Sequence, residues 1–230
     1  MKTLSNTSNL IVLYEDNHII IVNKRPGDIV QGDKTGDQPL SEVVKDYIAE
    51  KYNKPGAVYL GVVHRLDRPT SGIVVFARTS KALTRLNKVF ANKEIQKTYW
   101  AVVQPAPKQP QATLVHWLKR NTKQNKSYAH QNEVSESKKA SLSYRVLKKL
   151  QRFQLLEIDL HTGRHHQIRA QLSAIGCHIK GDLKYGASRS NKNGSIHLHA
   201  RKLQFTHPVK KEAMTIIAPP PSDSVWDDCL

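Results

Sequence analysis

Short apolar runs separated by turn-forming residues dominate the first third of the chain. Residues 10–14 (LIVLY) and 19–22 (IIIV) are rich in aliphatic and β-branched side chains, and Asp16 and Asn17 lie between them. This pattern predicts a β-hairpin. Apolar residues then recur through residues 40–48 at spacings of three and four, which predicts one buried helix face.

The same reading extends to the rest of the chain. Further strands are predicted at residues 59–63, 73–77, 98–103, 112–118, 141–147, 153–160, 196–205 and 214–218. Helices are predicted from a cap at Ser80 to residue 90, and at residues 165–175. Strands come in hairpins without a regular βαβ alternation, so we predict an α+β fold. Its mixed, largely antiparallel sheet is flanked by helices and loops.

The chain shows no internal repeat and no composition shift that marks a linker. We therefore predict one domain, of a size typical of enzymes, over residues 10–221, with a flexible N-terminal segment at residues 1–9. Three prolines at 219–221 are expected to end the ordered core, which leaves residues 222–230 as a C-terminal tail.

Charge narrows the range of partners. The 230 residues carry 36 Lys or Arg against 19 Asp or Glu, a formal net charge of +17. Residues 78–150 hold 16 of these cations and three acids, together with several aromatic residues. Cations follow phosphates and aromatic rings stack on unpaired bases, so this region predicts an RNA partner.

Other protein classes are disfavoured by composition. The two cysteines, Cys177 and Cys229, lie far apart and do not form a disulfide scaffold. No apolar run approaches the ~20 residues of a membrane span, and the polar start lacks the apolar stretch of a secretory signal. A cytoplasmic protein without membrane contact is expected.

The most unusual segment is a polar stretch between two apolar strands, residues 64–72 (HRLDRPTSG). Asp67 has Arg65 and Arg68 as neighbours. Adjacent cations favour an ionised carboxylate, and an ionised carboxylate in a loop on a rigid scaffold is a candidate nucleophile or base. The alternative is an aspartate that only accepts hydrogen bonds within a turn.

A second polar segment, residues 160–169 (LHTGRHHQIR), leaves a strand and enters a helix. Arg164 therefore lies near a helix N-terminus, where a positive charge is unfavourable. This placement suggests an anionic partner, either Asp67 or a phosphate. The alternative is an arginine that points into solvent.

The histidines match no zinc-ligand spacing, and no glycine-rich nucleotide-binding motif occurs. We therefore expect neither a metal nor a cofactor. Ser71 lacks the Gly-x-Ser-x-Gly context of a hydrolase nucleophile.

Five motifs, in order along residues 10–218, resemble those of the RluA family of pseudouridine synthases. They are Asn23-Lys24 with Pro26-Gly27, His64–Asp67 with Thr70–Gly72, Lys97-Thr98-Tyr99, Thr162–Arg169 with Gly181-Asp182 and Tyr185-Gly186, and His199-Ala200 with Leu203, Phe205 and His207-Pro208. Each motif alone is only suggestive, but the ordered set is specific.

Two departures concern the first motif. Arg25 is inserted between its lysine and proline, and Gln31 stands where the family commonly has histidine. We expect these changes to affect substrate fit rather than chemistry. We also expect that the chain lacks the accessory N-terminal RNA-binding domain of many members.

The resemblance implies an isomerase that converts uridine in RNA to pseudouridine after flipping the base. Asp67 resembles the nucleophile, which attacks either C1′ of the ribose or the uracil ring. Tyr99 resembles the residue that stacks on the base and assists proton removal, and Arg164 resembles the partner of Asp67. His64 and His166 are expected to be structural.

The resemblance also implies an RNA-binding set. Its members are Arg65, which would replace the flipped base, and Arg68, Thr70, Lys97 and Arg169. The expected substrate is structured ribosomal RNA or transfer RNA, and the expected state is a monomer.

Two other functions fit part of the pattern. A non-catalytic RNA-binding or ribosome-assembly protein explains the charge but not the grouping of Asp67, Tyr99 and Arg164 in matching motifs. A metal-dependent nuclease or deaminase lacks the expected ligands, including a Cys-x-x-Cys pair.

Overall fold

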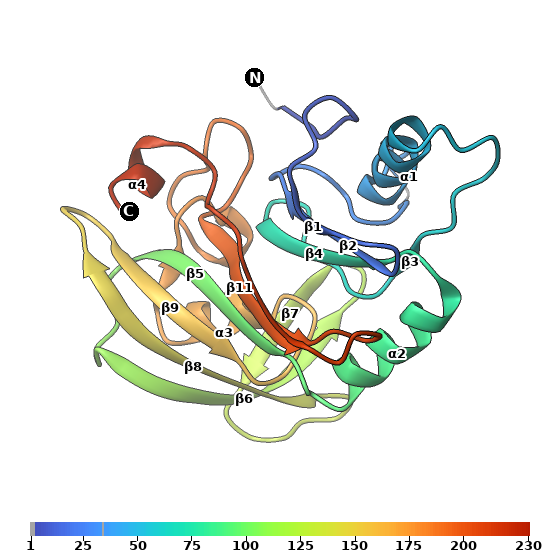
Figure 1. The fold of residues 1–230 in the computed structure, drawn as a ribbon. Helices are drawn as coiled ribbons and strands as arrows, with labels where there is room; N and C mark the ends of the chain where they lie inside the picture. The colour runs from blue at the N-terminus through green and yellow to red at the C-terminus, as the bar shows by residue number, and fades with distance from the viewer. Residues whose placement is uncertain (1–2, 34) are drawn as a thin grey trace. The chain divides into compact units, whose positions relative to one another are not determined.

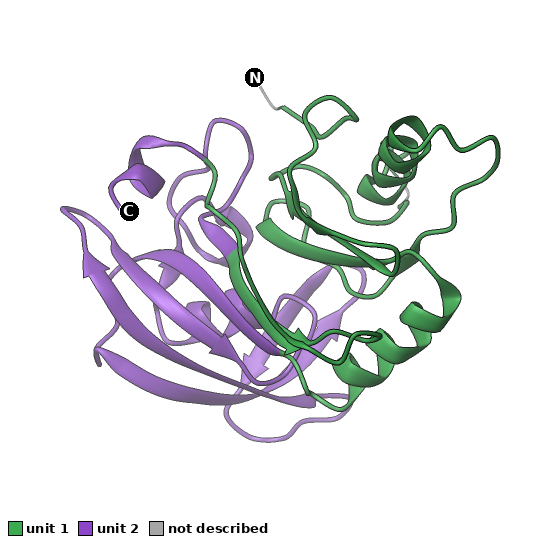
Figure 2. Ribbon diagram, in the orientation of Figure 1, with its two compact units in different colours: residues 1–95, 200–221 green, residues 96–199, 222–230 purple. Residues whose placement is uncertain are grey.

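The computed structural model describes residues 3–33 and 35–230 (Figure 1). The chain divides into two compact units, coloured separately in Figure 2. Unit 1 comprises Met1–Ile95 and Ala200–Pro221, and unit 2 comprises Gln96–His199 and Ser222–Leu230. Of the predicted N-terminal segment, Met1 and Lys2 lie outside the described residues, and Ser5 hydrogen-bonds to Asp28 through its amide and hydroxyl.

Unit 1 is built on a sheet with the strand order β1-β2-β4-β11, to which β3 adds on β4 and β12 on β11. The strands are β1 (Val12–Glu15), β2 (Ile19–Lys24), β3 (Gly61–Val62), β4 (Ser71–Ala77), β11 (Leu198–Thr206), which joins unit 1 at Ala200, and β12 (Ala213–Ile217). Its helices are α1 (Leu40–Lys51) and α2 (Ser80–Ala91).

Strands β2 and β4 are buried along their whole length. Successive side chains of a strand point to opposite faces, so one apolar run can serve two cores. Ile20 and Val22 pack with α1, whereas Ile19 and Ile21 pack with α2. The two helices therefore cover opposite faces of this sheet.

The cap of α2 differs from the expected one. Thr79, not Ser80, is the N-cap, and its hydroxyl accepts a hydrogen bond from the amide of Ala82 at 3.1 Å. The backbone of Thr79 is extended, as an N-cap requires, and Ser80 is already helical.

Unit 2 is built on a sheet with the strand order β5-β9-β8-β6-β7, to which β10 adds on β5. The strands are β5 (Gln96–Gln104), β6 (Gln111–Asn121), β7 (Lys126–His130), β8 (Lys138–Lys149), β9 (Gln154–Leu160) and β10 (His178–Ile179). Its helices are α3 (Gln167–Ala174), the short 3-10 helix η1 (Leu183–Tyr185) and α4 (Ser224–Asp227).

Alternation along β5 again divides the side chains between two cores. Ala101 and Val103 face the cluster that contains Ile168 of α3. Val102 faces the opposite side and packs with Trp226 of α4. These two core clusters of unit 2 thus depend on helices that follow β5 in sequence.

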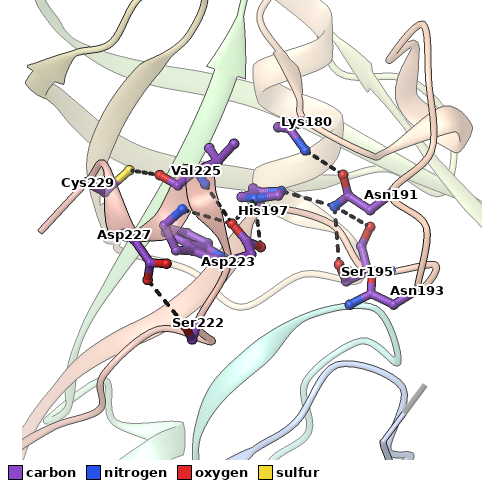
Figure 3. A network of polar contacts seen from close by, with 11 residues as sticks. Lys180, Asn191, Asn193, Ser195, His197, Ser222, Asp223, Val225, Asp227 and Cys229 are labelled. Carbon is purple, nitrogen blue, oxygen red and sulfur yellow. Dashed lines mark hydrogen bonds and ion pairs between the residues drawn. The ribbon is translucent and has the colours of Figure 1, made fainter. Parts of the chain in front are cut away.

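The segment after the three prolines is part of the core of unit 2 (Figure 3). Trp226 is 2% exposed, and its ring stacks on His197 at a centroid distance of 5.1 Å. Asp223 caps α4 and lies 3.2 Å from Nε2 of His197. This arrangement corrects the expectation that order ends at Pro221, because one buried aromatic ring is enough to fix a short helix.

The fold class is α+β, as predicted, and the pairs that build both sheets are largely antiparallel. Strand β7 was not expected from the sequence, and β3 is shorter than the predicted strand at residues 59–63. Among the helices of the described residues, none is long and apolar enough to cross a membrane.

Candidate active site

The loop that carries Asp67 joins β3 to β4 in unit 1. The amide of Thr70 donates to the carbonyl of Asp67 at 3.0 Å, which closes a turn with Arg68 and Pro69 at its centre. Asp67 is half-buried and Arg65 is exposed. Arg68 forms an ion pair with Asp37. The turn that the sequence suggested is therefore present, and it presents a carboxylate between two arginines.

A buried lysine holds the backbone of this loop through hydrogen bonds. Lys24, at the end of β2, is 1% exposed. Its ammonium donates to the carbonyls of Arg25 at 3.0 Å, Arg68 at 3.1 Å and Thr70 at 2.6 Å. Hydrogen bonds from a charged donor are stronger than neutral ones, so the backbone on the C-terminal side of Asp67 is firmly held.

Close backbone packing restricts the end of the same loop. Gly72 has φ of +115°, and a Cβ at this position would lie 2.4 Å from the carbonyl oxygen of Ala200. Only glycine fits a left-handed conformation against a neighbouring backbone. This explains why glycine ends the polar segment.

His64 begins the loop as a structural residue, as expected. Its Nε2 accepts a hydrogen bond from the amide of Val75 at 3.1 Å, and its ring stacks on Phe90 at 4.9 Å. The turn at residues 25–28 supports the loop from another side, because the amide of Gly27 donates to the carbonyl of Arg68 at 2.7 Å. The inserted Arg25 thus lies next to the Asp67 loop, whereas Gln31 is exposed.

In unit 2, β5 presents Lys97 and Tyr99 on one side. Thr98, between them, points to the other side. It is buried, and its hydroxyl donates to the carboxylate of Asp159 at 2.9 Å. Tyr99 packs against the core cluster below α3 and is half-buried. Its register partner is Ile158 on β9, two residues before that strand ends. The loop after β9 therefore begins beside Lys97 and Tyr99.

The loop that carries Arg164 joins β9 to α3 and is organised by Gln167. The Gln167 side-chain oxygen accepts from the Thr162 hydroxyl at 2.7 Å and from the Arg164 amide at 3.0 Å. Its amide nitrogen donates to the carbonyl of Ser141 at 3.0 Å. One buried side chain thus satisfies backbone groups that precede the helix.

Arg164 itself is exposed, and its Nε donates to the carbonyl of Lys139 at 3.3 Å. His166, the residue before α3, has φ of 53°, and its Nδ1 lies 2.9 Å from the hydroxyl of Tyr185. His166 is structural, as expected. The guanidinium of Arg164 is left at the surface, close to the helix N-terminus.

Lys97 lies beside this loop. A Cβ at Gly163 would be 3.9 Å from Nζ of Lys97. Burial lowers the pKa of the Lys97 ammonium below its ordinary value. Unit 2 therefore brings Lys97, Tyr99 and the Arg164 loop to one end of its sheet.

Arg169 lies inside unit 2. It is 5% exposed and forms a two-point ion pair with the buried carboxylate of Asp182, at 2.7 and 2.8 Å. Its guanidinium also stacks on Tyr185 at 4.9 Å. These contacts hold α3 and η1 together, and contact of Arg169 with RNA stays a prediction.

The sequence-predicted residues are thus divided between the units. Arg65, Asp67, Arg68 and Thr70 share one loop of unit 1, where Thr70 is 2% exposed. Lys97, Tyr99, Arg164 and Arg169 lie in unit 2. The clamp made by Lys24 was missed, although a lysine that ends an apolar strand next to a turn was a visible signal.

No group of three histidine, cysteine, aspartate or glutamate side chains in residues 3–33 and 35–230 is arranged to hold a metal ion. The two cysteines are buried and free.

Comparison with known sequences identifies the family. A sequence model described as RNA pseudouridylate synthase matches residues 18–174. The chain is 32% identical to ribosomal large subunit pseudouridine synthase D of Zymomonas mobilis, over 93% of this chain and 70% of that protein. It is 29% identical to tRNA pseudouridine synthase C of Vibrio cholerae, over 96% of this chain and 94% of that protein.

A comparison of structures shows the fold. The human protein RNA pseudouridylate synthase domain containing 4 shares the fold with a TM-score of 0.77, at 22% identity, over 94% of this chain and 90% of the human chain. The family match covers the Asp67 loop, β5 and the Arg164 loop, and it disfavours a non-catalytic RNA-binding protein. The chain belongs to the RluA family of RNA pseudouridylate synthases, which are isomerases.

Proposed function

We propose that Asp67 is the nucleophile with which this synthase isomerises uridine to pseudouridine in structured RNA. The observation that carries this assignment is the fixed Asp67 loop. A half-buried carboxylate lies in a turn whose backbone is held by the buried ammonium of Lys24. Fixing a reactive group before the substrate arrives lowers the entropic cost of the reaction.

The reaction exchanges one bond of the base for another. Asp67 attacks C1′ of the ribose or the uracil ring, the C1′–N1 bond breaks, and the uracil rotates. C5 then bonds to C1′, and the bond between Asp67 and the ribose or the ring breaks, which restores the carboxylate. The proton at C5 leaves, and N1 gains a proton. No electrons are gained or lost, so the residues of the chain suffice for this chemistry.

The target base has to leave its stack before its glycosidic bond can be reached. Arg65 is exposed on the same loop as Asp67. We assign to its side chain the role of filling the space in the RNA that the flipped base leaves. Arg68, held by Asp37, is assigned to a phosphate nearby. The buried Thr70 is assigned to shaping the loop.

Unit 2 supplies the remaining roles. Tyr99 has a ring suited to stacking on the flipped base and to assisting proton removal from C5. The exposed guanidinium of Arg164 is suited to an anion, which we take to be Asp67 or a phosphate of the substrate. Lys97 and Arg169 are assigned to the RNA-binding set, and Arg169 also joins α3 to η1 through Asp182.

The substrate is proposed to be ribosomal RNA or transfer RNA, because the relatives named above are a ribosomal large subunit enzyme and a tRNA enzyme. The net charge of +17 favours a polyanionic partner of this kind. We further propose that the protein acts as a monomer in the cytoplasm.

A tritium-release assay tests the proposal. Bulk ribosomal RNA and bulk transfer RNA, each labelled with tritium at C5 of uracil, are incubated with the protein and with Asp67→Asn. Formation of the C5–C1′ bond releases the label to water. We expect release from at least one RNA class, and a loss of more than a thousandfold in Asp67→Asn, because removal of a nucleophile abolishes the covalent route.

Asp46→Asn is the matched control, because Asp46 is exposed on α1 of the same unit. It should release tritium at the rate of the unchanged protein. Release by Asp67→Asn at the control rate would overturn the assignment of Asp67. No release from either RNA pool by the unchanged protein, at a salt concentration that permits binding, would overturn the proposed substrates.

A further inference from the structure

The hairpin of β6 and β7 carries a pocket that the proposed active-site residues do not explain. Its volume is about 380 Å³. Its lining is cationic and aromatic: Lys119, Arg120, Asn121, Thr122, Lys123, Tyr128 and His130. Pockets of roughly 300–1,000 Å³ are typical of small-ligand sites.

The strand register explains why this pocket faces outward. Lys119 pairs with Tyr128, so their side chains share one face of the hairpin. Leu118 pairs with Ala129 and faces the opposite side, where both pack in the core with Tyr185. Lys119 and Tyr128 therefore lie on the outer face of the hairpin, whereas Arg120 pairs with Ser127 and follows the alternation of Leu118.

The cations of the pocket are available to an anionic ligand. Lys123 is exposed and has no hydrogen bond or ion pair within the described part of the chain. Arg120 contacts only the neutral side chain of Asn125, at 3.4 Å. Lys119 lies 3.4 Å from Glu136, whose side chain is 81% exposed. Exposed pairs of this kind are weak and exchange readily.

Tyr128 adds a surface for stacking. Tyr128 is 40% exposed, so its ring is accessible to a ligand. The ring is held in place, because its hydroxyl donates to Gln124 at 2.5 Å and the ammonium of Lys126 lies 5.3 Å from its centre. Exposed aromatic rings next to cations are how proteins bind unpaired nucleotides.

The turn of this hairpin is tied to the Arg164 loop. Nε2 of His165 lies 3.1 Å from the side-chain oxygen of Asn125. The Ser127 hydroxyl donates to the carbonyl of His165 at 2.8 Å. A ligand in the hairpin pocket is thus held at a fixed place relative to Arg164.

We infer that the hairpin pocket binds an unpaired nucleotide of the substrate RNA. Tyr128 stacks on the base, while Lys119 and Lys123 contact the adjoining phosphates. This inference deepens the proposed function and rests on it for the identity of the RNA as substrate. Binding of single-stranded RNA to the pocket can be measured without the isomerisation reaction.

Fluorescence anisotropy with labelled RNA tests the pocket directly. The probes are a twelve-nucleotide oligouridine strand and a blunt RNA duplex of the same length. We expect Tyr128→Ala to weaken binding of the single strand by about 5- to 150-fold, the range of stacking on one base. Tyr128→Phe, which keeps the ring, should bind like the unchanged protein, and the duplex should be insensitive to both changes.

Salt dependence tests the cations. The slope of log K against log salt changes by about 0.7 for each phosphate contact with a single strand. Lys119→Gln with Lys123→Gln should therefore lower the slope by about 1.4. The control is Lys148→Gln with Lys149→Gln, which removes the same amount of charge. These two lysines lie at the end of β8, where they pair with Leu155 and Gln154, away from the turn of the β6–β7 hairpin. The control should change the slope far less.

Two results would overturn the inference: binding by Tyr128→Ala equal to that of the unchanged protein, or equal slope changes in the two lysine pairs. Tritium release separates this inference from the proposed function. Tyr128→Ala should raise KM and leave kcat unchanged. Tyr128-dependent binding without any tritium release would contradict the proposed function alone, and tritium release without a Tyr128 effect would contradict the pocket alone.

Discussion

A buried cation holds the Asp67 loop in unit 1, and another joins α3 to η1 in unit 2, but the two cations have different partners. Lys24, 1% exposed, donates to three neutral backbone carbonyls. Arg169, 5% exposed, faces the carboxylate of Asp182. One clamp acts on the loop backbone itself, and the other joins two elements through a neutralised pair.

This difference determines which clamp can be replaced. A buried ion pair can be exchanged as a pair for apolar residues, often at little cost in stability. Backbone carbonyls cannot be removed by substitution, so loss of Lys24 leaves them without their donor whatever else is changed. Loss of one side chain therefore removes several hydrogen bonds from the backbone of the Asp67 loop, whereas the contact between α3 and η1 can be replaced as a pair.

The largest effect is expected from Arg169→Met, which leaves the Asp182 carboxylate buried without its cation. Breaking a buried pair in this way costs about 3–5 kcal/mol. The measurement is urea unfolding followed by tryptophan fluorescence, because all three tryptophans, Trp100, Trp117 and Trp226, lie in unit 2.

The double variant Arg169→Met with Asp182→Leu sharpens this test. It removes both charges and should recover most of the lost free energy of unfolding. If the double variant is as unstable as the single one, the guanidinium acts mainly through its stacking on Tyr185, and the comparison between the two clamps fails.

A somewhat smaller loss is expected from Lys24→Met. The carbonyls of Arg25, Arg68 and Thr70 lose a charged donor, and unsatisfied buried groups cost about 1–3 kcal/mol each, less where water enters. We expect about 2–4 kcal/mol for unit 1 in total. Hydrogen exchange of the β2 and β4 amides is the measurement, since unit 1 contains no tryptophan.

Lys45→Met on α1 is the matched control for Lys24→Met. Lys45 is at the surface and pairs with Glu42 at 2.9 Å within the helix, and such pairs contribute only about 0.3–0.5 kcal/mol. Equal exchange rates in the two variants would show that Lys24 does not fix the loop. Tritium release should fall in Lys24→Met even under conditions in which the protein remains folded.

The same contrast explains how much could be predicted from the sequence. The apolar run of β2 and the polar break at residues 64–72 were recognisable because each contrasts sharply with its neighbours. The position of Lys24 at the end of an apolar strand was visible, but its contacts with the carbonyls of Arg68 and Thr70, more than 40 residues away, have no sequence signature. Gly72 was noted only as part of a motif, and its reason, the approach of Ala200, is a tertiary contact.

The elements that were missed are those with little apolar content. Strand β7 buries only Ser127 among its five residues, so it lacks the alternation that marks a half-buried strand. Helix α4 is four residues long and is fixed by the single ring of Trp226. Both depend on packing against elements formed elsewhere in unit 2, and local pattern cannot supply that information.

The smallest expected effect concerns two buried histidines, one in each unit. Burial lowers the pKa of His116 in unit 2 below 6.5. Burial also lowers the pKa of His207 in unit 1, but there the Asp16 carboxylate, 3.0 Å from Nε2, opposes the shift. Since the unfolded chain binds protons more readily at both sites, stability is full above pH 6.5 and falls as the pH drops through the folded pKa.

Unit 2 should therefore lose more stability than unit 1 on acidification, because His116 has no carboxylate to oppose its shift. We expect a loss of about 1 kcal/mol or less from this group between about pH 7.5 and pH 5.5. His116→Gln, which keeps a polar partner for Gln171, should flatten the pH dependence of tryptophan-detected unfolding. If the unfolding free energy of His116→Gln depends on pH as steeply as that of the unchanged protein, other groups cause the acid sensitivity of unit 2. The difference between the units would then not arise from His116.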